Sequence, residues 1–182
     1  MQAIFSPASL SDIAALITLI NRAYRGPAGK QGWTTEADLL SGRRTDSANL
    51  LRLLTEPNSV ILTAKQQHNL LACVHLQHSG QLAQFSMFAV EPALQNQGLG
   101  KQLLATAETT AQQLWSVDSF IMWVISRRSE LLAFYVRRGY CRTGVSQSFP
   151  ADSDLWQAKV ADLRLELLEK TAIKLQNGLN PT

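Results

Sequence analysis

The sequence contains very little cysteine and no long hydrophobic run, and each absence excludes a class of protein. Cys73 and Cys141 are the two cysteines among 182 residues, and neither a CxxC pair nor a histidine cluster accompanies them. Neither a disulfide framework nor a zinc site is therefore indicated, and we expect both cysteines to be buried as small apolar residues. No apolar run approaches the roughly 20 residues of a membrane span. The opening "MQAIFSPASLSD" lacks the basic flank and apolar stretch of a signal peptide, which predicts a cytoplasmic protein without a membrane partner.

An excess of charge of one sign is also lacking. Lys and Arg total 17 against 14 Asp and Glu, which gives a net charge of +3 and an isoelectric point of about 9.1. The basic residues are scattered, so an anionic small molecule is favoured as partner over nucleic acid. A chain without repeats or a linker is most simply one domain over residues 1–182, with "LQNGLNPT" as a loose tail. A homodimer is compatible with this composition.

The first third of the chain alternates helical patterns with turn residues. Residues 2–6 predict a short strand, and Ser9 or Ser11 is expected to begin a helix. An apolar stripe at helical spacing predicts that helix; it consists of Leu10, Ile13, Ile17, Ile20 and Tyr24. The glycines and proline of "RGPAGKQGW" predict an exposed irregular loop. A second helix is predicted near "TTEADLL", where Thr35 and Asp38 have capping-box spacing, and Thr45 is the expected cap of the helix through "SANLLRLL".

The remainder of the chain contains mainly strand patterns, with two further helices. Polar turns separate "SVILTAK", "LLACVHLQ" and "QLAQFSMFAV", which predicts an antiparallel meander. A helix is expected from Gly98 to Trp115, because Leu99, Leu103, Ala107, Ala111 and Leu114 share one face. The nearly continuous apolar run "SFIMWVIS" predicts a central strand, and "RSELLAFYVRR" a helix that stops at Gly139. Two last strands are predicted in "YCRTGVSQSF" and "DLRLELLEK".

Two glycines stand between a predicted strand and a predicted helix in "LQNQGLGKQLLATAE". A strand ending at Val90 and a helix opening at Gly98 leave unpaired N–H groups at the helix start, where the helix dipole favours negative charge. Gly98 and Gly100 would let a phosphate approach these amides, and Lys101 and Gln95 add hydrogen-bond donors. The pattern therefore indicates an anion site, best suited to a pyrophosphate.

Three other interpretations of these glycines compete with that one. A Walker A motif requires glycine at position 95 and Ser or Thr at position 102, where Gln95 and Gln102 stand. A dinucleotide fingerprint requires a third glycine at Leu103 and a parallel βαβ unit in place of the meander. The glycines could also form only a tight turn after a strand.

The wider context resembles one known family. The segment "FAVEPALQNQGLGKQLLATAE" followed by "VISRRSELLAFYVRRGY" resembles the GNAT superfamily of acyl-CoA-dependent N-acyltransferases. The family's first motif is a strand, V-x-P, Q-x-x-G-x-G and a helix; its second is a helix with a tyrosine four residues before G-[FY]. Tyr135, Gly139 and Tyr140 have that spacing, and Arg128 stands where the family often has asparagine. The order of the elements from residue 2 to about residue 170 is similar as well.

The resemblance implies a fold and a donor. The fold is α/β, with a mixed, mostly antiparallel sheet of about seven strands, helices on both faces and a splay between the fourth and fifth strands. The donor is acetyl-CoA, with its pyrophosphate on the amides of residues 95–101 and its pantetheine paired with the strand as an added strand. The coenzyme contacts so implied are Phe88, Ala89, Val90, Gln95, Asn96, Gln97, Gly98, Leu99, Gly100, Lys101, Arg128 and Tyr135.

The resemblance also suggests catalytic roles. The Val90 N–H would stabilise the thioester oxygen as negative charge develops, and Tyr135 would protonate the departing thiolate. An attacking ammonium must first lose a proton, for which Glu36 and Glu91 are the acidic candidates and His75 is the histidine in a strand centre. Each has a plain structural alternative: a helix first-turn acid for Glu36, a solvated strand end for Glu91 and a hydrogen-bonded core histidine for His75.

The implied reaction is acetyl transfer from acetyl-CoA to a primary amine of a small molecule in one ternary complex, without a metal. No cysteine lies in the two motifs to carry the acetyl group. The acceptor would meet Trp33, Asp152, Asp154 and Trp156, and the aspartates suggest a cationic molecule, although they could equally cap turns. Two alternatives stay open: a non-catalytic acyl-CoA-binding regulatory module, and an acetyltransferase of protein lysines or N-termini.

Overall fold

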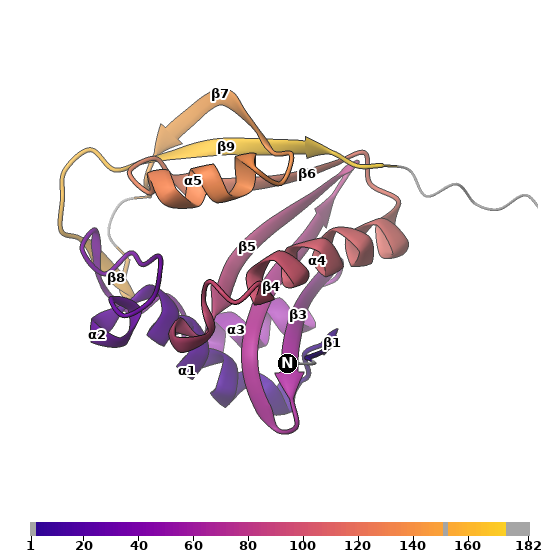
Figure 1. Ribbon diagram of the computed structural model, residues 1–182, viewed down its shortest axis with the longest axis horizontal. Helices are drawn as coiled ribbons and strands as arrows, with labels where there is room; N and C mark the ends of the chain where they lie inside the picture. Colours follow the sequence, from indigo (N-terminus) through magenta and orange to yellow (C-terminus); the bar gives the residue numbers. More distant parts are fainter. Residues whose placement is uncertain (1–2, 151–152, 174–182) are drawn as a thin grey trace, which may run out of the picture.

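The computed structural model describes residues 3–150 and 153–173, which are built around a twisted sheet (Figure 1). Across the sheet the strands lie in the order β1-β3-β4-β5-β6-β9-β7. They are β1 (Ile4–Pro7), β3 (Ser59–Gln66), β4 (Asn69–Ser79), β5 (Leu82–Val90), β6 (Ser119–Ile125), β7 (Cys141–Ser148) and β9 (Arg164–Thr171). Neighbouring strands pair antiparallel except β5 and β6, which are parallel. The predicted mixed, mostly antiparallel seven-stranded sheet and its central meander are confirmed.

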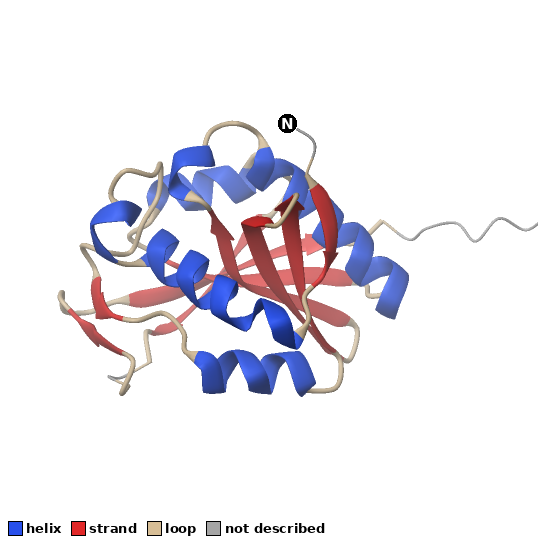
Figure 2. Cartoon of the chain, turned by 90° about the horizontal axis from the view of Figure 1, so that it is seen from below, coloured by secondary structure: helices blue, strands red, loops and turns tan. Residues whose placement is uncertain are grey.

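Helices cover both faces of the sheet, as Figure 2 shows. Helices α1 (Ile13–Tyr24) and α3 (Ser47–Thr55) pack on one face, and α4 (Leu99–Trp115) and α5 (Ser129–Val136) on the other. Because successive strand side chains point to opposite faces, neighbours such as Ile61 and Leu62 belong to different hydrophobic clusters. The shorter helical segments are η1 (Leu10–Asp12), α2 (Gly26–Gly29) and η2 (Pro92–Leu94). None of the described helices is long and apolar enough to cross a membrane.

Strands β5 and β6 separate halfway along their length, as the implied fold requires. Their pairing joins residues 82–85 to residues 119–122 and goes no further. From there the two strands diverge, which is visible in Figure 1 as a widening gap between the ribbons. Strand β5 continues along β4 to Val90, after an irregularity at Met87, whose φ is +46°. The far half of β5 therefore has one side without a strand partner.

The segment before residue 46 differs from its prediction. No helix follows Thr35; Asp38 pairs with Lys30 in an ion pair of 2.6 Å, and β2 (Leu40–Gly42) pairs with β8 (Trp156–Ala158). A contact more than a hundred residues away thus overrides a local capping signal. The predicted irregular loop after α1 contains the short helix α2.

Several smaller predictions were also wrong. The cap of α3 is Asp46, whose carboxylate accepts from the Asn49 N–H at 2.8 Å, and not Thr45. Leu10 and Leu114 are more than half exposed, because each stands at an end of its apolar stripe. Cys73 is buried as expected, but Cys141 is exposed on the edge strand β7. The tail predicted to be loose lies outside the described residues.

Candidate active site

The first turn of α4 offers free backbone donors at the open end of β5. Gly98 is the N-cap residue with φ +85°, a conformation that favours glycine, and no side chain of the described residues caps the helix. A Cβ built on Gly98 would have no atom of the described residues within 4 Å. The space beside Gly98 is therefore open among these residues. The first turn also carries no acidic residue. These features leave the helix start available to an anion.

A cavity of about 330 Å³ lies beside this turn. Four basic residues line it, Lys101, Arg128, Arg137 and Arg138, and no Asp or Glu is found among its described lining residues. The expected contacts that line it are Phe88, Ala89, Val90, Gln95, Asn96, Gly98, Gly100, Lys101 and Arg128. The surplus of positive charge in its walls favours an anionic ligand in this first cavity.

Three expected coenzyme contacts lie elsewhere. Gln97 is exposed and donates to the Ala93 carbonyl at 3.1 Å, while the Leu99 side chain is buried in the core. Tyr135 lines the neighbouring cavity. Leu99 is a residue whose backbone, and not its side chain, can face a ligand.

Arg137 and Arg138 were not among the sequence candidates, although "VRRGY" places both immediately before the family glycine. The Arg138 guanidinium lies 3.4 Å above the Phe134 ring centre and donates to the Phe134 carbonyl at 2.6 Å. Its Nε is buried without a partner in the described structure. Burial and the nearby Arg137 charge lower the pKa of Arg138. An anionic ligand would supply the missing partner.

Gln95 holds the loop after α2 against the end of β5. Its Oε1 accepts from the Trp33 N–H at 2.6 Å, and its Nε2 donates to the Val90 carbonyl at 3.3 Å. The side-chain amide is therefore engaged within the protein, whereas the sequence suggested that it would bind phosphate. Trp33 stands beside Phe134, with ring centres 5.7 Å apart, and lines the first cavity.

The backbone of β5 presents polar groups on its open side. The Phe88 carbonyl accepts from the Tyr24 hydroxyl at 3.1 Å, and the Val90 carbonyl accepts from Gln95. Neither donor belongs to β4, so Phe88 and Val90 direct their backbone toward the splay. Because the N–H and C=O of one strand residue point the same way, the Val90 N–H faces the first cavity.

A second cavity of about 330 Å³ adjoins the first. The two share Tyr24, Phe88, Arg128 and Leu131 in their walls. The second cavity continues between the separated ends of β5 and β6, where its apolar walls include Met122, Val124, Phe149, Trp156 and Leu165.

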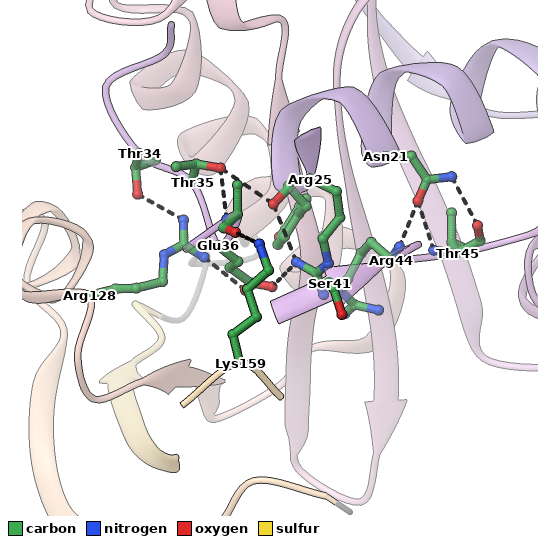
Figure 3. A network of polar contacts seen from close by, with 12 residues as sticks. Asn21, Arg25, Thr34, Thr35, Glu36, Ser41, Arg44, Thr45, Arg128 and Lys159 are labelled. Atoms are coloured by element: carbon green, nitrogen blue, oxygen red, sulfur yellow. Dashed lines mark hydrogen bonds and ion pairs between the residues drawn. The ribbon is translucent and has the colours of Figure 1, made fainter. Parts of the chain in front are cut away.

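A buried ion triad closes one wall of the second cavity. Arg128 donates from Nη1 to Oε1 of Glu36 at 3.0 Å, and Arg25 donates to the other carboxylate oxygen (Figure 3). Arg128 also donates from Nη2 to the Thr34 hydroxyl at 2.8 Å. All three ions are less than a tenth exposed. The triad joins the end of α1, the following loop and the start of α5, so that it fixes three distant segments at the site.

Two tyrosines stand near the junction of the cavities. Tyr135 on α5 meets the Phe88 ring edge-on at 6.3 Å between centres, and its hydroxyl makes no hydrogen bond within the described residues. Burial raises the pKa of Tyr135 well above the ordinary value, so its phenol stays protonated. Tyr24 was not among the sequence candidates for catalysis; it lines both cavities, and burial raises its pKa to about 12.

The three candidate bases are all engaged. Both carboxylate oxygens of Glu36 accept from arginines, and Glu91 pairs with Arg22 at 3.2 Å outside the walls of both cavities. His75 has Ser59 at 2.9 Å from Nε2 and Ser86 at 2.8 Å from Nδ1, and burial lowers its pKa to about 4. Of the stated structural alternatives, the geometry matches the hydrogen-bonded core histidine for His75, whereas Glu36 belongs to no helix and Glu91 is held in an ion pair.

The expected acceptor residues that the structure describes do not line one common cavity. Trp156 lines the second cavity, but Trp33 lines the first. Asp154 is exposed and lines neither, and Asp152 lies outside the described residues. No group of three or more His, Cys, Asp or Glu side chains that could hold a metal ion occurs in the described part of the chain.

Residues 57–142 match the family model described as "Acetyltransferase (GNAT) domain". This segment, slightly less than half of the chain, is therefore similar to the GNAT acetyltransferases. The matched segment runs from β3 to the start of β7 and contains both the α4 turn and Tyr135. A GNAT domain is an acyltransferase, and the family uses acetyl-CoA or another acyl-CoA. Among proteins of curated function, none matches the sequence.

Solved structures with this GNAT fold cover nearly the whole chain. The Escherichia coli ribosomal-protein-S18-alanine N-acetyltransferase has a TM-score of 0.70 at 14% identity, over 100% of this chain and 99% of that one. A GNAT-family acetyltransferase from Streptococcus pneumoniae has a TM-score of 0.65 at 17% identity, over 93% and 99%. An N-acetyltransferase from Staphylococcus aureus Mu50 has a TM-score of 0.68 at 12% identity, over 95% and 100%. At such identities the likeness shows the fold alone.

Proposed function

We propose that this chain, as one domain, transfers an acetyl group from acetyl-CoA to a primary amine of a small molecule within one ternary complex. The observation that carries the proposal is the pair of adjoining cavities at the splay of β5 and β6. The first has the charge for a phosphorylated donor, and the second has an apolar interior for an acceptor. Their shared wall at Phe88 is where two substrates would meet.

The residues of the first cavity fit a coenzyme with phosphate groups. The N–H groups of the α4 first turn and the side chains of Lys101, Arg137 and Arg138 would hold the phosphates. The exposed backbone of Phe88 and Val90 would pair with the pantetheine amides. Acetyl-CoA supplies an acetyl group that is activated as a thioester.

Two groups serve the acyl transfer itself. The Val90 N–H would donate to the acetyl oxygen, where negative charge grows as the amine attacks the carbonyl carbon. The Tyr135 hydroxyl would give its proton to the sulfur as the carbon–sulfur bond breaks. The phenol is protonated at neutral pH, and its hydroxyl has no competing hydrogen bond within the described residues.

Deprotonation of the amine needs no side-chain base in this account. Only a neutral amine is a nucleophile, and nearby positive charge lowers the pKa of an ammonium. The second cavity has Arg25, Arg44 and Arg128 in its walls against the single carboxylate of Glu36 among the described residues. This surplus favours the neutral amine, which would lose its proton to solvent.

Direct transfer is favoured over an acetyl-cysteine because neither thiol is placed for chemistry. Cys73 is buried, and burial raises its pKa to about 12, so it is not a thiolate at neutral pH. Cys141 is exposed on β7, and neither cysteine lines one of the two cavities.

The test is thiol release from acetyl-CoA in the presence of a broad panel of small amines, with the N-acetyl product identified by mass spectrometry. We expect turnover that depends on both substrates. Binding of acetyl-CoA without turnover of any amine would instead favour a regulatory acyl-CoA-binding module. Turnover of protein lysines or N-termini alone would show that the acceptor is a protein.

A further inference from the structure

The charge of the second cavity is opposite to what a cationic acceptor requires. Three guanidinium groups and one carboxylate stand in the described walls of the cavity. Each carboxylate oxygen of Glu36 is paired with an arginine, one with Arg25 and the other with Arg128. Glu36 therefore offers no free carboxylate oxygen to a cationic ligand. Of the two aspartates suggested by the sequence, Asp154 lines neither cavity, and Asp152 lies outside the described residues.

Arg44 is the cation of this cavity without an anionic partner. Its backbone N–H is held by Asn21 at 2.6 Å, which Figure 3 shows, and its guanidinium lies 5.5 Å from the Tyr24 ring centre. Within residues 3–150 and 153–173 that guanidinium makes no hydrogen bond or ion pair. Two further donors, Nε of Arg25 and Nε of Arg128, are buried without partners among the described residues. Buried donors without partners are costly, and a bound anion would satisfy them.

The unpaired cation stands close to the place of acetyl transfer. Arg44 and Arg128 both face the Tyr24 ring, at 5.5 and 5.8 Å from its centre. The hydroxyl of that ring donates to the Phe88 carbonyl at 3.1 Å, on the wall shared by the two cavities. An anion held by Arg44 would therefore lie on the same side of the second cavity as an amine that attacks beside Phe88.

Apart from these ions and the polar residues Gln84, Ser86 and Gln147, the walls of the second cavity are mainly apolar. Phe149 and Trp156 meet at 6.3 Å between ring centres, and Met122 and Leu165 line the same space. A bulky hydrocarbon or aromatic group fills such a wall favourably, whereas a second charge would lose its hydration there.

We propose that the acceptor of this enzyme carries a carboxylate within a few bonds of its primary amine, together with a bulky apolar group, and that Arg44 binds the carboxylate. An amino acid with an apolar side chain has this chemistry. The inference rests on the proposed function, since it assigns the substrate class of the same site. Polyamines and other polycations are disfavoured by the same charges.

Binding of matched ligands tests the proposal without depending on turnover. L-phenylalanine, L-phenylalaninamide and phenethylamine share one benzyl group and differ in the carboxylate. Their dissociation constants are measured by calorimetry on the full chain saturated with CoA, and the series is repeated with the leucine and tryptophan side chains. We expect the acid to bind about tenfold or more tightly than its amide and amine in at least one series.

Variants of neighbouring arginines locate the effect. Arg44→Gln should abolish the preference for the acid, and Arg44→Lys should retain part of it because the charge remains. Arg43→Gln is the matched control, since Arg43 is exposed and lines neither cavity, and it should leave the preference unchanged. Thermal unfolding of each variant confirms that the fold is intact.

The outcomes separate this inference from the proposed function. Equal binding of acid, amide and amine in every series, absence of binding by all three head groups, or an unchanged preference in Arg44→Gln overturns the inference, even if neutral amines are acetylated. An acid preference that depends on Arg44 but comes without thiol release supports the inference about the ligand and overturns the proposed acetyl transfer.

Discussion

The phenols of Tyr135 and Tyr24 both lie near Phe88, on the wall shared by the two cavities. The two tyrosines differ in their hydrogen bonds. Tyr24 already donates to Phe88, whereas Tyr135 has no such bond within the described residues. We therefore expect Tyr135→Phe to lower kcat by about 100-fold, with little change in acetyl-CoA binding, because proton donation matters only as charge develops on sulfur. Tyr24→Phe is the matched variant and should lower kcat much less.

Steady-state kinetics and calorimetry on both variants provide the measurement. A Tyr135→Phe enzyme whose kcat stays within about threefold of the parent across pH would show that solvent protonates the thiolate. A larger loss in Tyr24→Phe would transfer the role to Tyr24.

His75 predicts a pH dependence of stability. Its pKa is lowered to about 4 in the folded chain, below the roughly 6.5 expected when unfolded. His75 therefore binds a proton more readily in the unfolded chain than in the folded chain. The stability that neutral His75 contributes is complete above pH 6.5 and is lost as pH falls toward 4. Between pH 7 and pH 5 it should lower the free energy of unfolding by about 2 kcal/mol.

Denaturant unfolding of wild type and His75→Gln at both pH values measures this difference. The variant should lose that part of the pH dependence, whereas His68→Gln, at an exposed turn, should keep it. Identical pH slopes in all three proteins would contradict the assignment to His75.

At the scale of elements, the Arg25–Glu36–Arg128 triad connects α1, the loop after α2 and α5. Glu36→Gln would leave two buried guanidinium groups without their counterion, and we expect it to lower the free energy of unfolding by roughly 3 kcal/mol. Glu56→Gln breaks an exposed pair with Arg52 and should cost less than about 1 kcal/mol. Urea unfolding compares them; a Glu36→Gln protein that lost activity at unchanged stability would restore Glu36 as the candidate base.

The α4 turn predicts a loss of donor binding from one added side chain. Asn tolerates positive φ better than most residues, so Gly98→Asn should keep the turn but fill space beside the helix start. We expect acetyl-CoA to bind about tenfold more weakly, which corresponds to about 1.4 kcal/mol.

Gly80→Asn is the control for that substitution. Gly80 has φ +61° and open space around it, but it lies in the β4–β5 turn, away from both cavities. Calorimetric titration with acetyl-CoA should show unchanged affinity for this variant. If both variants bound acetyl-CoA more weakly by the same factor, the loss at Gly98 would come from a general effect of substituting a glycine with positive φ and not from contact with a bound anion.

Elements governed by local pattern were predictable, and those governed by distant contacts were not. Alternation and polar turns sufficed for the β3-β4-β5 meander, and the glycine turn for the start of α4. The β2–β8 pair could not be read from sequence, because Leu40 and Ala158 carry no local signal of their pairing. The ion pairs of Glu36 could not be predicted for the same reason: its partner Arg128 is 92 residues away.

At the scale of the whole molecule, two adjoining cavities lie at the opening between β5 and β6. The lining of the first cavity, proposed to hold the coenzyme, was largely predictable, since many of its residues follow one another from β5 into α4. The second cavity is lined by residues from the end of α1, from both sides of β2, from β6 and from the segment between β7 and β8. Because these segments lie far apart in the sequence, the net positive charge of the cavity became visible only in the fold. That charge is why we propose an acceptor with a carboxylate in place of the cationic acceptor expected from the aspartates.

The central claim is that both substrates occupy this opening at once, and intact-protein mass spectrometry with two-substrate kinetics tests it most directly. After mixing with acetyl-CoA alone, the enzyme should show no covalent acetyl adduct, and rates measured with donor and amine both varied should give intersecting double-reciprocal lines. Cys73→Ala and Cys141→Ala should each retain turnover. An acetylated enzyme that passes its acetyl group to the amine, with parallel lines, would contradict direct transfer at the splay.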